Sequence, residues 1–326
     1  MKNQEPRTRN QEPGTRNREP RTENQELRTE NQEPGTRNRE PGTENHKLRT
    51  ENRELRTSGE EMKDADDNTK AVQWRDCAIA GQEGAPVFVL IHGARLTRAM
   101  WQPQIDALSD TFRVIAPDLP GHGALAGVPF SIDAAVERVA AVVDSIGGER
   151  VMVCGLSLGG YVALAFGARY PSRTAALILS GCAFAFNSFT GRLLRAPYLA
   201  ISRLLTGNFA PLLARAEERT FRKRYPPALA DAIVARGFFY RFYPEISAAL
   251  IDFDPLPALR ACECPVLLLN GAADRFFRRD ERLYLRALRS GRVRLIEGAA
   301  HMANLDQPEA YTRALRDFAT EIATVQ

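Results

Sequence analysis

The sequence predicts an α/β protein whose core is a doubly wound, mostly parallel sheet. From residue 72 onward, short apolar runs of strand length alternate with longer runs that have helical spacing, which is typical of βαβ units. The strand-like run that begins at Val151 ends in Gly-x-Ser-x-Gly and passes at once into a helix-like run. A long segment, 184–257, is helix-like throughout and interrupts the alternation. We therefore expect a parallel sheet that carries a helical insertion.

The strand-like runs are short and rich in β-branched and aliphatic residues. They span 72–80, 87–91, 113–116, 151–155, 176–180, 265–270 and 292–297. The helix-like runs repeat apolar residues at helical spacing. They span 98–109, 131–146, 158–170, 280–289 and 308–322. The run 72–80 is the weakest of the strands and is expected to form one or two short pieces.

Residues 3–58 consist of eight copies of a seven-residue repeat, of which the first reads NQEPRTR. A period of seven is typical of coiled coils. Each copy, however, holds at most one apolar side chain, and five copies contain proline, which breaks helices. Such a segment buries too little apolar surface to offset the entropy that is lost on ordering. The sequence therefore predicts that residues 1–61 form a disordered tail.

The tail is balanced in charge, with 13 Lys and Arg and 13 Asp and Glu side chains through Glu61. It is therefore a poor anchor for nucleic acid. A near-identical peptide repeat is what a tandem repeat in the coding sequence would encode, and Met62 follows it directly. Our hypothesis is that the native chain starts at Met62 and that the tail is translated leader. The alternative is that the tail is a tethering linker.

Residues 62–326 have the length of one large domain. The formal net charge of +4 lies in this part because the tail nets zero, and so small an excess predicts no nucleic-acid partner. No apolar run approaches the length that spans a membrane, and the N-terminus lacks the apolar core of a signal peptide. We expect a cytoplasmic protein with no membrane partner, and the oligomeric state stays open.

The cysteines are Cys77, Cys154, Cys182, Cys262 and Cys264. Their spacing indicates no disulfide framework, and the Cys-x-Cys pair at 262–264 lacks the spacing and the partners of a zinc site. Cys154 and Cys182 stand at the ends of apolar strands and are expected to be buried thiols. We therefore expect neither disulfides nor a metal site.

Ser157 is the candidate nucleophile. It lies in Gly155-Leu156-Ser157-Leu158-Gly159 between a strand-like and a helix-like run, which is the context of a nucleophile elbow. The glycines lack a Cβ, so the strand and the helix can approach closely around the serine. The hydroxyl would then be exposed at the carboxyl end of the sheet. The alternative is an ordinary glycine-rich turn between strand and helix.

The candidate base is taken from four histidines, namely His46, His92, His122 and His301. His46 lies in the repeats, and His92 and His122 precede the serine. His301 alone lies far downstream, in a loop between a strand-like and a helix-like run. A loop histidine beyond a strand end suits a general base.

Asp274 is the candidate acid that would orient the imidazole. It follows 265–270, the most apolar strand candidate, and precedes His301 by 27 residues. Asp280 is a rival, but its position is that of a helix N-cap. Asp252 and Asp254 are weaker rivals.

These features together resemble the α/β-hydrolase superfamily from roughly Ala71 to Ile322. The matching motifs, in family order, are the strand and oxyanion loop 87–93, the Asp-x-x-Gly-His-Gly loop 118–123, the elbow 155–159, the acid Asp274 and the base His301. The resemblance implies a mostly parallel, eight-stranded sheet with helices on both faces. It also implies a substrate-covering cap between the sixth and seventh strands, where the helical segment 184–257 lies.

The resemblance also implies a mechanism. His301 would take the proton of Ser157 during attack on a carbonyl carbon. The backbone N–H groups of Leu158 and Ala94 would stabilise the oxyanion. His301 would then protonate the leaving group, and water would release the acyl group. No step needs a metal ion or an organic cofactor.

Two histidines and two arginines lie close to these motifs. The family uses His92 and His122 structurally, so we expect both to hold loops by hydrogen bonds. Arg95 and Arg98 follow the oxyanion loop. They are either solvated surface charges or contacts for an acidic substrate, and Arg95 is the more interesting because it stands one residue past the expected donor.

The candidate substrate contacts are Arg95, Trp101 and Tyr161. Trp101 falls where many members carry an aromatic residue, and Tyr161 follows the elbow glycines. The segment 184–257 is rich in aromatic residues and arginine. This composition fits a cap with an apolar inner surface, and we expect substrate choice to be set there.

We expect a serine hydrolase that cleaves a small or medium carboxylic ester, lactone or thioester. The same triad supports C–C bond hydrolysis, lyase, perhydrolase and acyltransferase chemistry in this family, and these stay open. Tyr161 stands where lyase-like members often have arginine. Epoxide hydrolases and dehalogenases use aspartate as the nucleophile, so Ser157 argues against both. A receptor-like, non-catalytic role is a further alternative, although such relatives usually lose triad members.

Overall fold

The computed structural model describes residues 74–325, except 149, 188, 205, 207 and 208. The chain divides into two units, Met1–Leu55 and Arg56–Gln326, and all described residues belong to the second. The predictions of a disordered tail over 1–61 and of a native start at Met62 fall outside the described residues, as does His46.

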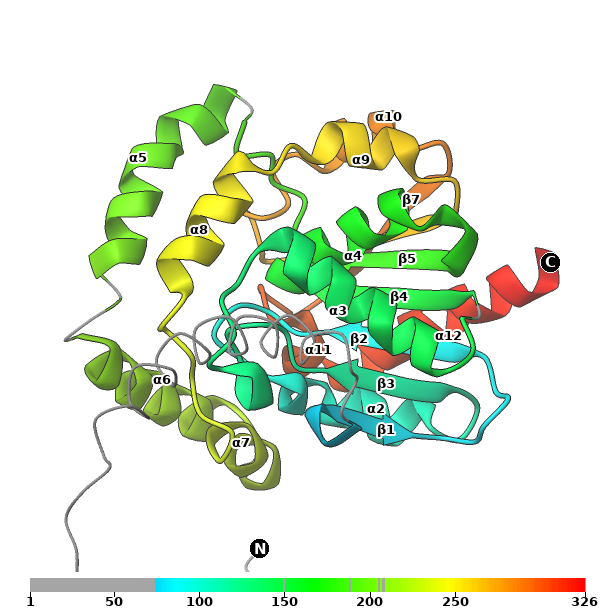
Figure 1. Cartoon of the computed structure of the whole chain (residues 1–326), viewed down its shortest axis with the longest axis horizontal. Coiled ribbons are helices and arrows are strands. Elements are labelled where there is room, and N and C mark those ends of the chain that lie inside the picture. The colour runs from blue at the N-terminus through cyan, green and yellow to red at the C-terminus, as the bar shows by residue number, and fades with distance from the viewer. Residues whose placement is uncertain (1–73, 149, 188, 205, 207–208, 326) are drawn as a thin grey trace, which may run out of the picture. The chain divides into compact units, whose positions relative to one another are not determined.

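A seven-stranded sheet forms the centre of the described part (Figure 1). Its strands are β1 (Cys77–Ala80), β2 (Val87–Ile91), β3 (Arg113–Pro117), β4 (Val151–Leu156), β5 (Thr174–Ser180), β6 (Val266–Gly271) and β7 (Gly291–Ile296). The order across the sheet is β1-β3-β2-β4-β5-β6-β7. β1 pairs antiparallel with β3, and every other pair is parallel. The predicted mostly parallel sheet is confirmed.

Helices connect the strands. They are α2 (Gln102–Leu108), α3 (Ile132–Ser145), α4 (Leu158–Arg169), α5 (Phe189–Leu204), α6 (Ala210–Arg224), α7 (Pro227–Val234), α8 (Tyr243–Asp252), α9 (Pro255–Ala261), α10 (Glu281–Ala287), α11 (Ala303–Asp306) and α12 (Pro308–Val325). Short 3₁₀ turns are η1 (Trp74–Asp76), η2 (Arg98–Trp101), η3 (Gly123–Leu125) and η4 (Pro171–Arg173).

Most predicted elements agree with the structure to within a few residues, and three differ. The single helix expected over 98–109 is split into η2 and α2. Pro103 stands in the first turn of α2, where a missing N–H is tolerated, but it cannot continue a preceding helix. The strand expected over 72–80 is reduced to β1. The described residues hold seven strands, one fewer than the eight that the family resemblance implies.

The inner strands β2, β4, β5 and β6 are buried throughout, whereas the edge strands β1 and β7 are partly exposed. Alternate side chains of a strand point to opposite faces of the sheet. In β2, Val87, Val89 and Ile91 belong to one hydrophobic core, and Phe88 and Leu90 belong to the other. Buried residues of α3, α4 and α9 complete the first core. Buried residues of α2, α11 and α12 complete the second. This arrangement, with helices on both faces, is why the strands read as continuous apolar runs.

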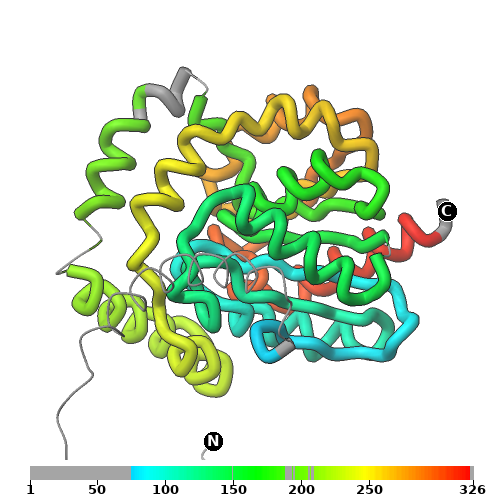
Figure 2. Tube along the Cα trace, in the orientation of Figure 1, coloured from blue at the N-terminus to red at the C-terminus, as the bar shows by residue number. Residues whose placement is uncertain are grey.

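The helical segment expected over 184–257 corresponds to α5 to α8, which lie between β5 and β6 in the chain. Figure 1 shows these four helices beside one end of the sheet, on the left of the view. The tube in Figure 2 follows the same segment, from green to yellow, until it returns to the sheet through α9. α9 packs on α4 and so belongs to the layer that covers the first core.

Candidate active site

Ser157 occupies a sharp turn between β4 and α4. Its backbone has φ 57° and ψ −117°, which is a costly conformation for a residue with a side chain. Ser157 N donates to Ser180 O at 2.7 Å, and Ser157 O accepts from Gly160 N at 2.9 Å. A Cβ on Gly155 would collide with the backbone of Gly159. The local geometry is therefore that of the predicted elbow, and it leaves the serine half-buried.

His301 and Asp274 meet in front of the carboxyl ends of β6 and β7. His301 Nδ1 lies 2.7 Å from Asp274 Oδ2, and the aspartate is buried, with 7% of its surface exposed. The imidazole stacks on Phe277, with ring centroids 4.3 Å apart. The backbone of Gly181 also lies close to the ring, since a Cβ added to this glycine would lie 3.0 Å from Nδ1. The imidazole is therefore positioned by the carboxylate of Asp274, the ring of Phe277 and the backbone of Gly181.

The three rival aspartates have other partners. Asp280 stands at the N-cap position of α10, as expected, but its carboxylate accepts from Ala185 N at 2.8 Å. Asp254 caps α9. Asp252 is exposed and pairs with Arg195. Asp274 is therefore the aspartate that contacts His301 among these four.

A largely buried polar network supports this side of the site, and it was not predicted from the sequence. Asn270 Oδ1 accepts from Gly181 N at 2.7 Å, and Asn270 Nδ2 donates to Glu281 at 2.8 Å. Arg278 donates to the same glutamate at 2.9 Å and to Ala272 O at 2.5 Å. The available signal was Asn270 itself, a polar residue at the end of an otherwise apolar strand.

The segment 181–185 after β5 is tied down at each residue beyond Gly181. The groups that bond its backbone are Tyr284 Oη to Cys182 O (2.8 Å), Asp280 N to Ala183 O (2.9 Å), Tyr161 Oη to Phe184 O (2.7 Å) and Ala185 N to Asp280 Oδ2 (2.8 Å). A Cβ added to Gly181 would lie 3.0 Å from the His301 ring, so these hydrogen bonds fix a backbone segment that lies close to the imidazole.

The two expected oxyanion donors are Ala94, in the loop after β2, and Leu158, at the start of α4. A Cβ on Gly93 would lie 3.6 Å from Ser157 Cβ, so Ala94 follows a backbone that touches the serine. Leu158 is the first residue of α4, and the N–H of a first helical residue has no partner within its helix. Leu158 directly follows Ser157 and Ala94 directly follows Gly93, so the role of their N–H groups as oxyanion donors stays a prediction.

His92 and His122 hold these loops together, as predicted. In each ring, Nδ1 forms a hydrogen bond with a backbone carbonyl and Nε2 accepts one from a backbone N–H. The contacts are His92 Nδ1 to Gly93 O (2.9 Å), Leu119 N to His92 Nε2 (3.0 Å), His122 Nδ1 to Pro120 O (2.9 Å) and Arg95 N to His122 Nε2 (3.1 Å). Burial lowers the pKa of His92 to about 4 and that of His122 to about 3. Both rings are therefore neutral, which the acceptor role of Nε2 requires.

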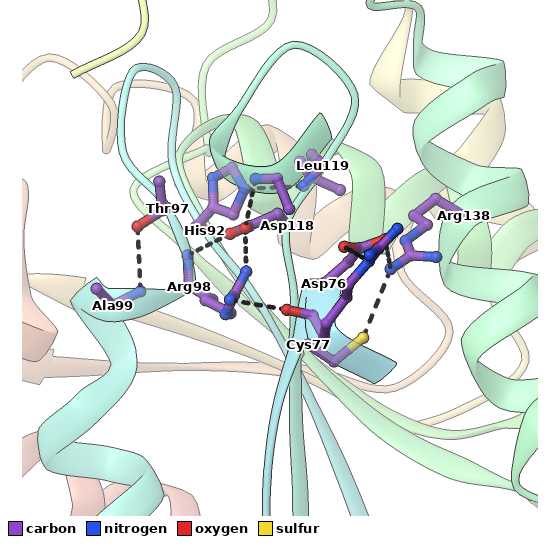
Figure 3. Close-up of polar contacts among 11 residues, drawn as sticks. Asp76, Cys77, His92, Thr97, Arg98, Ala99, Asp118, Leu119 and Arg138 are labelled. Carbon is purple, nitrogen blue, oxygen red and sulfur yellow. Dashed lines mark hydrogen bonds and ion pairs between the residues drawn. The ribbon is translucent and has the colours of Figure 1, made fainter. Parts of the chain in front are cut away.

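The structure contradicts both alternatives that were expected for Arg98, a solvated surface charge and a contact for an acidic substrate. Arg98 is buried and forms an ion pair with Asp118, so it is neither a solvated charge nor open to an acidic substrate. Asp118 also accepts from Arg98 N at 3.0 Å and Ala124 N at 3.0 Å. Figure 3 shows this pair next to the His92–Leu119 contact. The pair joins the loop after β2 to the loop after β3 at their base.

Arg95 is also not a simple surface charge. Its backbone has φ 68°, and its guanidinium Nη1 donates to Glu217 at 3.2 Å and to Tyr240 Oη at 3.1 Å. Phe239 N donates to Arg95 O at 2.9 Å. Arg95 therefore joins the oxyanion loop to the helical insertion. The sequence contained no signal for the partners, because they lie more than a hundred residues away.

The expected substrate contacts at Trp101 and Tyr161 are not supported. Trp101 is fully buried in the second core, where its ring lies 6.1 Å from that of Tyr311. Tyr161 is 1% exposed, and its hydroxyl bonds Phe184 O. Both positions are apolar packing sites under the loops, because the close approach of strand and helix leaves no open surface there.

Cys154 and Cys182 are buried thiols, as predicted. All five cysteines are free and buried. Burial raises the pKa of Cys77 to about 11 and that of Cys154 to about 12, so they are inert thiols. Within residues 74–325, apart from the gaps noted above, no group of three or more His, Cys, Asp or Glu side chains could hold a metal ion. No helix in that range is long and apolar enough to cross a membrane.

Comparison with known proteins gives a consistent result. The model of the alpha/beta hydrolase family matches residues 88–314. The chain is 32% identical over 252 residues to a pimeloyl-acyl-carrier-protein methyl ester esterase from Neisseria meningitidis, which covers 70% of this chain and 91% of that protein. It is 26% identical over 257 residues to 3-oxoadipate enol-lactonase 1 from Acinetobacter baylyi, covering 75% and 92%.

Solved structures show the same similarity. A thermophilic esterase from Thermogutta terrifontis superimposes with a TM-score of 0.62 at 26% identity, covering 76% of this chain and 93% of that one. The enol-lactonase from Burkholderia xenovorans LB400 gives a TM-score of 0.62 at 26% identity, covering 75% and 95%. The chain belongs to the α/β-hydrolase family, and within it to the carboxylic ester hydrolases of the esterase and lactonase branch.

Proposed function

We propose that this ester hydrolase cleaves a small or medium carboxylic ester, lactone or thioester with a Ser157–His301–Asp274 triad. The observation that carries the proposal is the 2.7 Å contact between His301 Nδ1 and Asp274 Oδ2. Ser157, in its strained turn, donates to the backbone of Ser180, and a Cβ added to the next residue, Gly181, would lie 3.0 Å from the His301 ring. The relatives named as an enol-lactonase and a methyl ester esterase support the ester class.

His301 is the general base in this mechanism. With Nδ1 held by Asp274, the Nε2 atom is left to accept the Ser157 proton as the hydroxyl attacks the carbonyl carbon. The buried carboxylate stabilises the imidazolium that forms. His301 then returns the proton to the leaving alkoxide or thiolate, and an acyl-enzyme remains.

The oxyanion is stabilised by the N–H groups of Ala94 and Leu158. Fixed backbone donors need no reorganisation when the negative charge develops, and each is worth roughly 3–4 kcal/mol in related sites. Water then attacks the acyl-enzyme with His301 as base, and the carboxylic acid leaves. The proposed chemistry uses this chain's own residues throughout, with no cofactor.

The helices α5 to α8 act as the cap that selects the substrate. Support comes from the contacts that Glu217, Phe239 and Tyr240 make with Arg95, one residue beyond the proposed donor Ala94. His122, under the same loop, also packs edge to face on Phe239, with centroids 6.2 Å apart. The insertion thus closes directly over the oxyanion loop.

The test is intact-mass spectrometry of the full chain after reaction with a fluorophosphonate probe. One adduct is expected on the wild type, located at Ser157 by peptide mapping, and none on Ser157→Ala. Ser180→Ala is the matched control because this buried serine is the last residue of the neighbouring strand β5, and it should keep the adduct. An adduct that survives Ser157→Ala, or a folded wild type that never reacts, would overturn the proposal.

A further inference from the structure

Arg95 is fixed close to the reacting serine by its backbone. Its N–H donates to His122 and its carbonyl accepts from Phe239 N, so the left-handed conformation at φ 68° is held from both sides. A Cβ added to Gly93 would lie 3.6 Å from Ser157 Cβ, so the backbone at Gly93 passes close to the serine. Two residues of chain span at most about 7.6 Å between Cα atoms. The Arg95 side chain therefore starts within reach of the acyl part of a bound substrate.

The guanidinium of Arg95 lies close to two neighbouring aromatic rings, whose centroids are 6.3 Å apart. Its carbon lies 5.5 Å from the centroid of Tyr240 and 5.6 Å from that of Tyr243. Burial alone would lower the pKa of Arg95, but Glu217 and the two tyrosines outweigh it and the pKa is raised. The group is permanently charged, and 34% of the side chain is still exposed.

The ion pair with Glu217 leaves part of this arginine unused. Both acceptors of the guanidinium, Glu217 and Tyr240, are bound by Nη1. The same glutamate oxygen also accepts from Tyr240 Oη at 2.5 Å, so Glu217 does not form the two parallel bonds of which an arginine is capable. Arg95 Nε is buried and has no partner within the described residues. An unpaired buried donor is costly, and a ligand acceptor would relieve that cost.

We propose that Arg95 forms an anion subsite for a carboxylate on the acyl part of the substrate. This rests on the proposed function, since it extends the site around Ser157. The preferred substrates are then half-esters or lactones in which a short aliphatic chain separates the reacting carbonyl from a carboxylate. The adjacent rings of Tyr240 and Tyr243 both lie close to the guanidinium, and Glu217 weakens the subsite by competing for the same cation.

The experiment compares two soluble substrates with equal acyl length, mono-4-nitrophenyl glutarate and 4-nitrophenyl pentanoate. The measured quantity is the ratio of their kcat/KM values on the full chain, because loss of folding or of oxyanion geometry cancels in the ratio. The wild type should favour the glutarate. Arg95→Met should lower the ratio roughly 10- to 100-fold, as expected for loss of a hydrogen bond to a charged group.

Two further variants test the direction in which the ratio of kcat/KM values should change. Glu217→Gln removes the competing charge with little change of shape and should raise the ratio several-fold. Arg215→Met is the matched control, since this exposed arginine lies on the same helix as Glu217, and it should leave the ratio unchanged. An equal loss on both substrates in Arg95→Met would mean that Arg95 only positions the loop, and a wild type that favours the pentanoate would also overturn the subsite.

A binding measurement separates this proposal from the proposed function. Monomethyl glutarate is titrated calorimetrically into Ser157→Ala, in which turnover plays no part. Binding that is lost in the Ser157→Ala, Arg95→Met double variant supports the subsite even if the fluorophosphonate test fails. Binding that is the same in both proteins, or no binding at millimolar ligand, overturns the subsite even if Ser157 is the nucleophile.

Discussion

The acid–base side of the candidate site is held by the sheet framework, whereas the oxyanion side is held by loops and by the insertion. Asp274 and His301 follow β6 and β7, and Asn270, at the end of β6, anchors Gly181 behind the imidazole. On the other side, Arg95 bonds Glu217 of α6. One half of the site therefore depends on contacts within the sheet and its adjoining loops, and the other half depends on a segment inserted between β5 and β6.

The two sides of the site therefore differ in how freely the residues that support them can be substituted. Exchange of residues in α5 to α8 can change the oxyanion loop and substrate preference without touching the Asp274–His301 contact. The insertion also carries five of the eight large exposed hydrophobic side chains in the described residues: Leu193, Ile201, Leu204, Phe209 and Leu212. The sheet framework is packed on both faces, so it offers much less freedom of this kind.

The largest effect is expected from breaking the acid–base side at its carboxylate. Asp274→Asn keeps the size of the side chain but removes the charge that orients and stabilises the imidazolium, so ester turnover should fall roughly 10⁴-fold. Steady-state kinetics with a chromogenic ester measures the loss. Asp252→Asn, at an exposed rival, is the control and should be unchanged. A near-normal rate in Asp274→Asn would assign the acid elsewhere.

A smaller effect is expected from Gly181→Ala, which moves the imidazole without removing any catalytic group. The new Cβ would lie 3.0 Å from Nδ1 and Cε1 of His301, so the ring must shift. A displacement of this kind lowers kcat about 100-fold, with little change in KM. Gly84→Ala is matched, because that residue also has a positive φ but meets nothing within 4 Å. Equal kcat in the two variants would exclude the backbone at Gly181 as a positioning device.

The smallest effect concerns the oxyanion side and appears in stability rather than in rate. Burial lowers the pKa of His92 to about 4 and that of His122 to about 3, from 6.5. Below pH 6.5, His92 and His122 bind protons in the unfolded chain but stay neutral in the folded chain. The contribution of these histidines to the free energy of unfolding is therefore largest above pH 6.5. It decreases as the pH falls toward 4 for His92 and toward 3 for His122. Between pH 7 and 6 the loss is roughly 0.7 kcal/mol per histidine.

Urea unfolding at pH 7, 6 and 5 measures this slope on the full chain. His122→Gln removes one of the two titrating rings, so the unfolding free energy should depend less steeply on pH than in the wild type. A slope that His122→Gln does not change would show that the loop histidines are not the groups that titrate.

Much of the fold could be predicted because its signals are local. The apolar runs of β2, β4, β5 and β6 are continuous since both faces of each strand are covered, and the Gly155 to Gly159 turn needs its glycines for steric reasons alone. Where prediction was wrong, the deciding contacts were distant. Trp101 and Tyr161 are packed under the loops, and Arg98 is paired with Asp118. None of these partners is visible from spacing.

By itself, the sequence determined the strand and helix pattern, the elbow around Ser157, and the order of serine, aspartate and histidine. These are set by short-range sterics and by hydrophobic periodicity. Only the tertiary structure decided which aspartate meets His301, that Asn270 and Gly181 support the ring, and that Glu217 and Tyr240 engage Arg95. A hydrogen bond or an ion pair depends on distances of a few ångströms between segments far apart in the chain, and those distances exist only once the sheet and the insertion have packed.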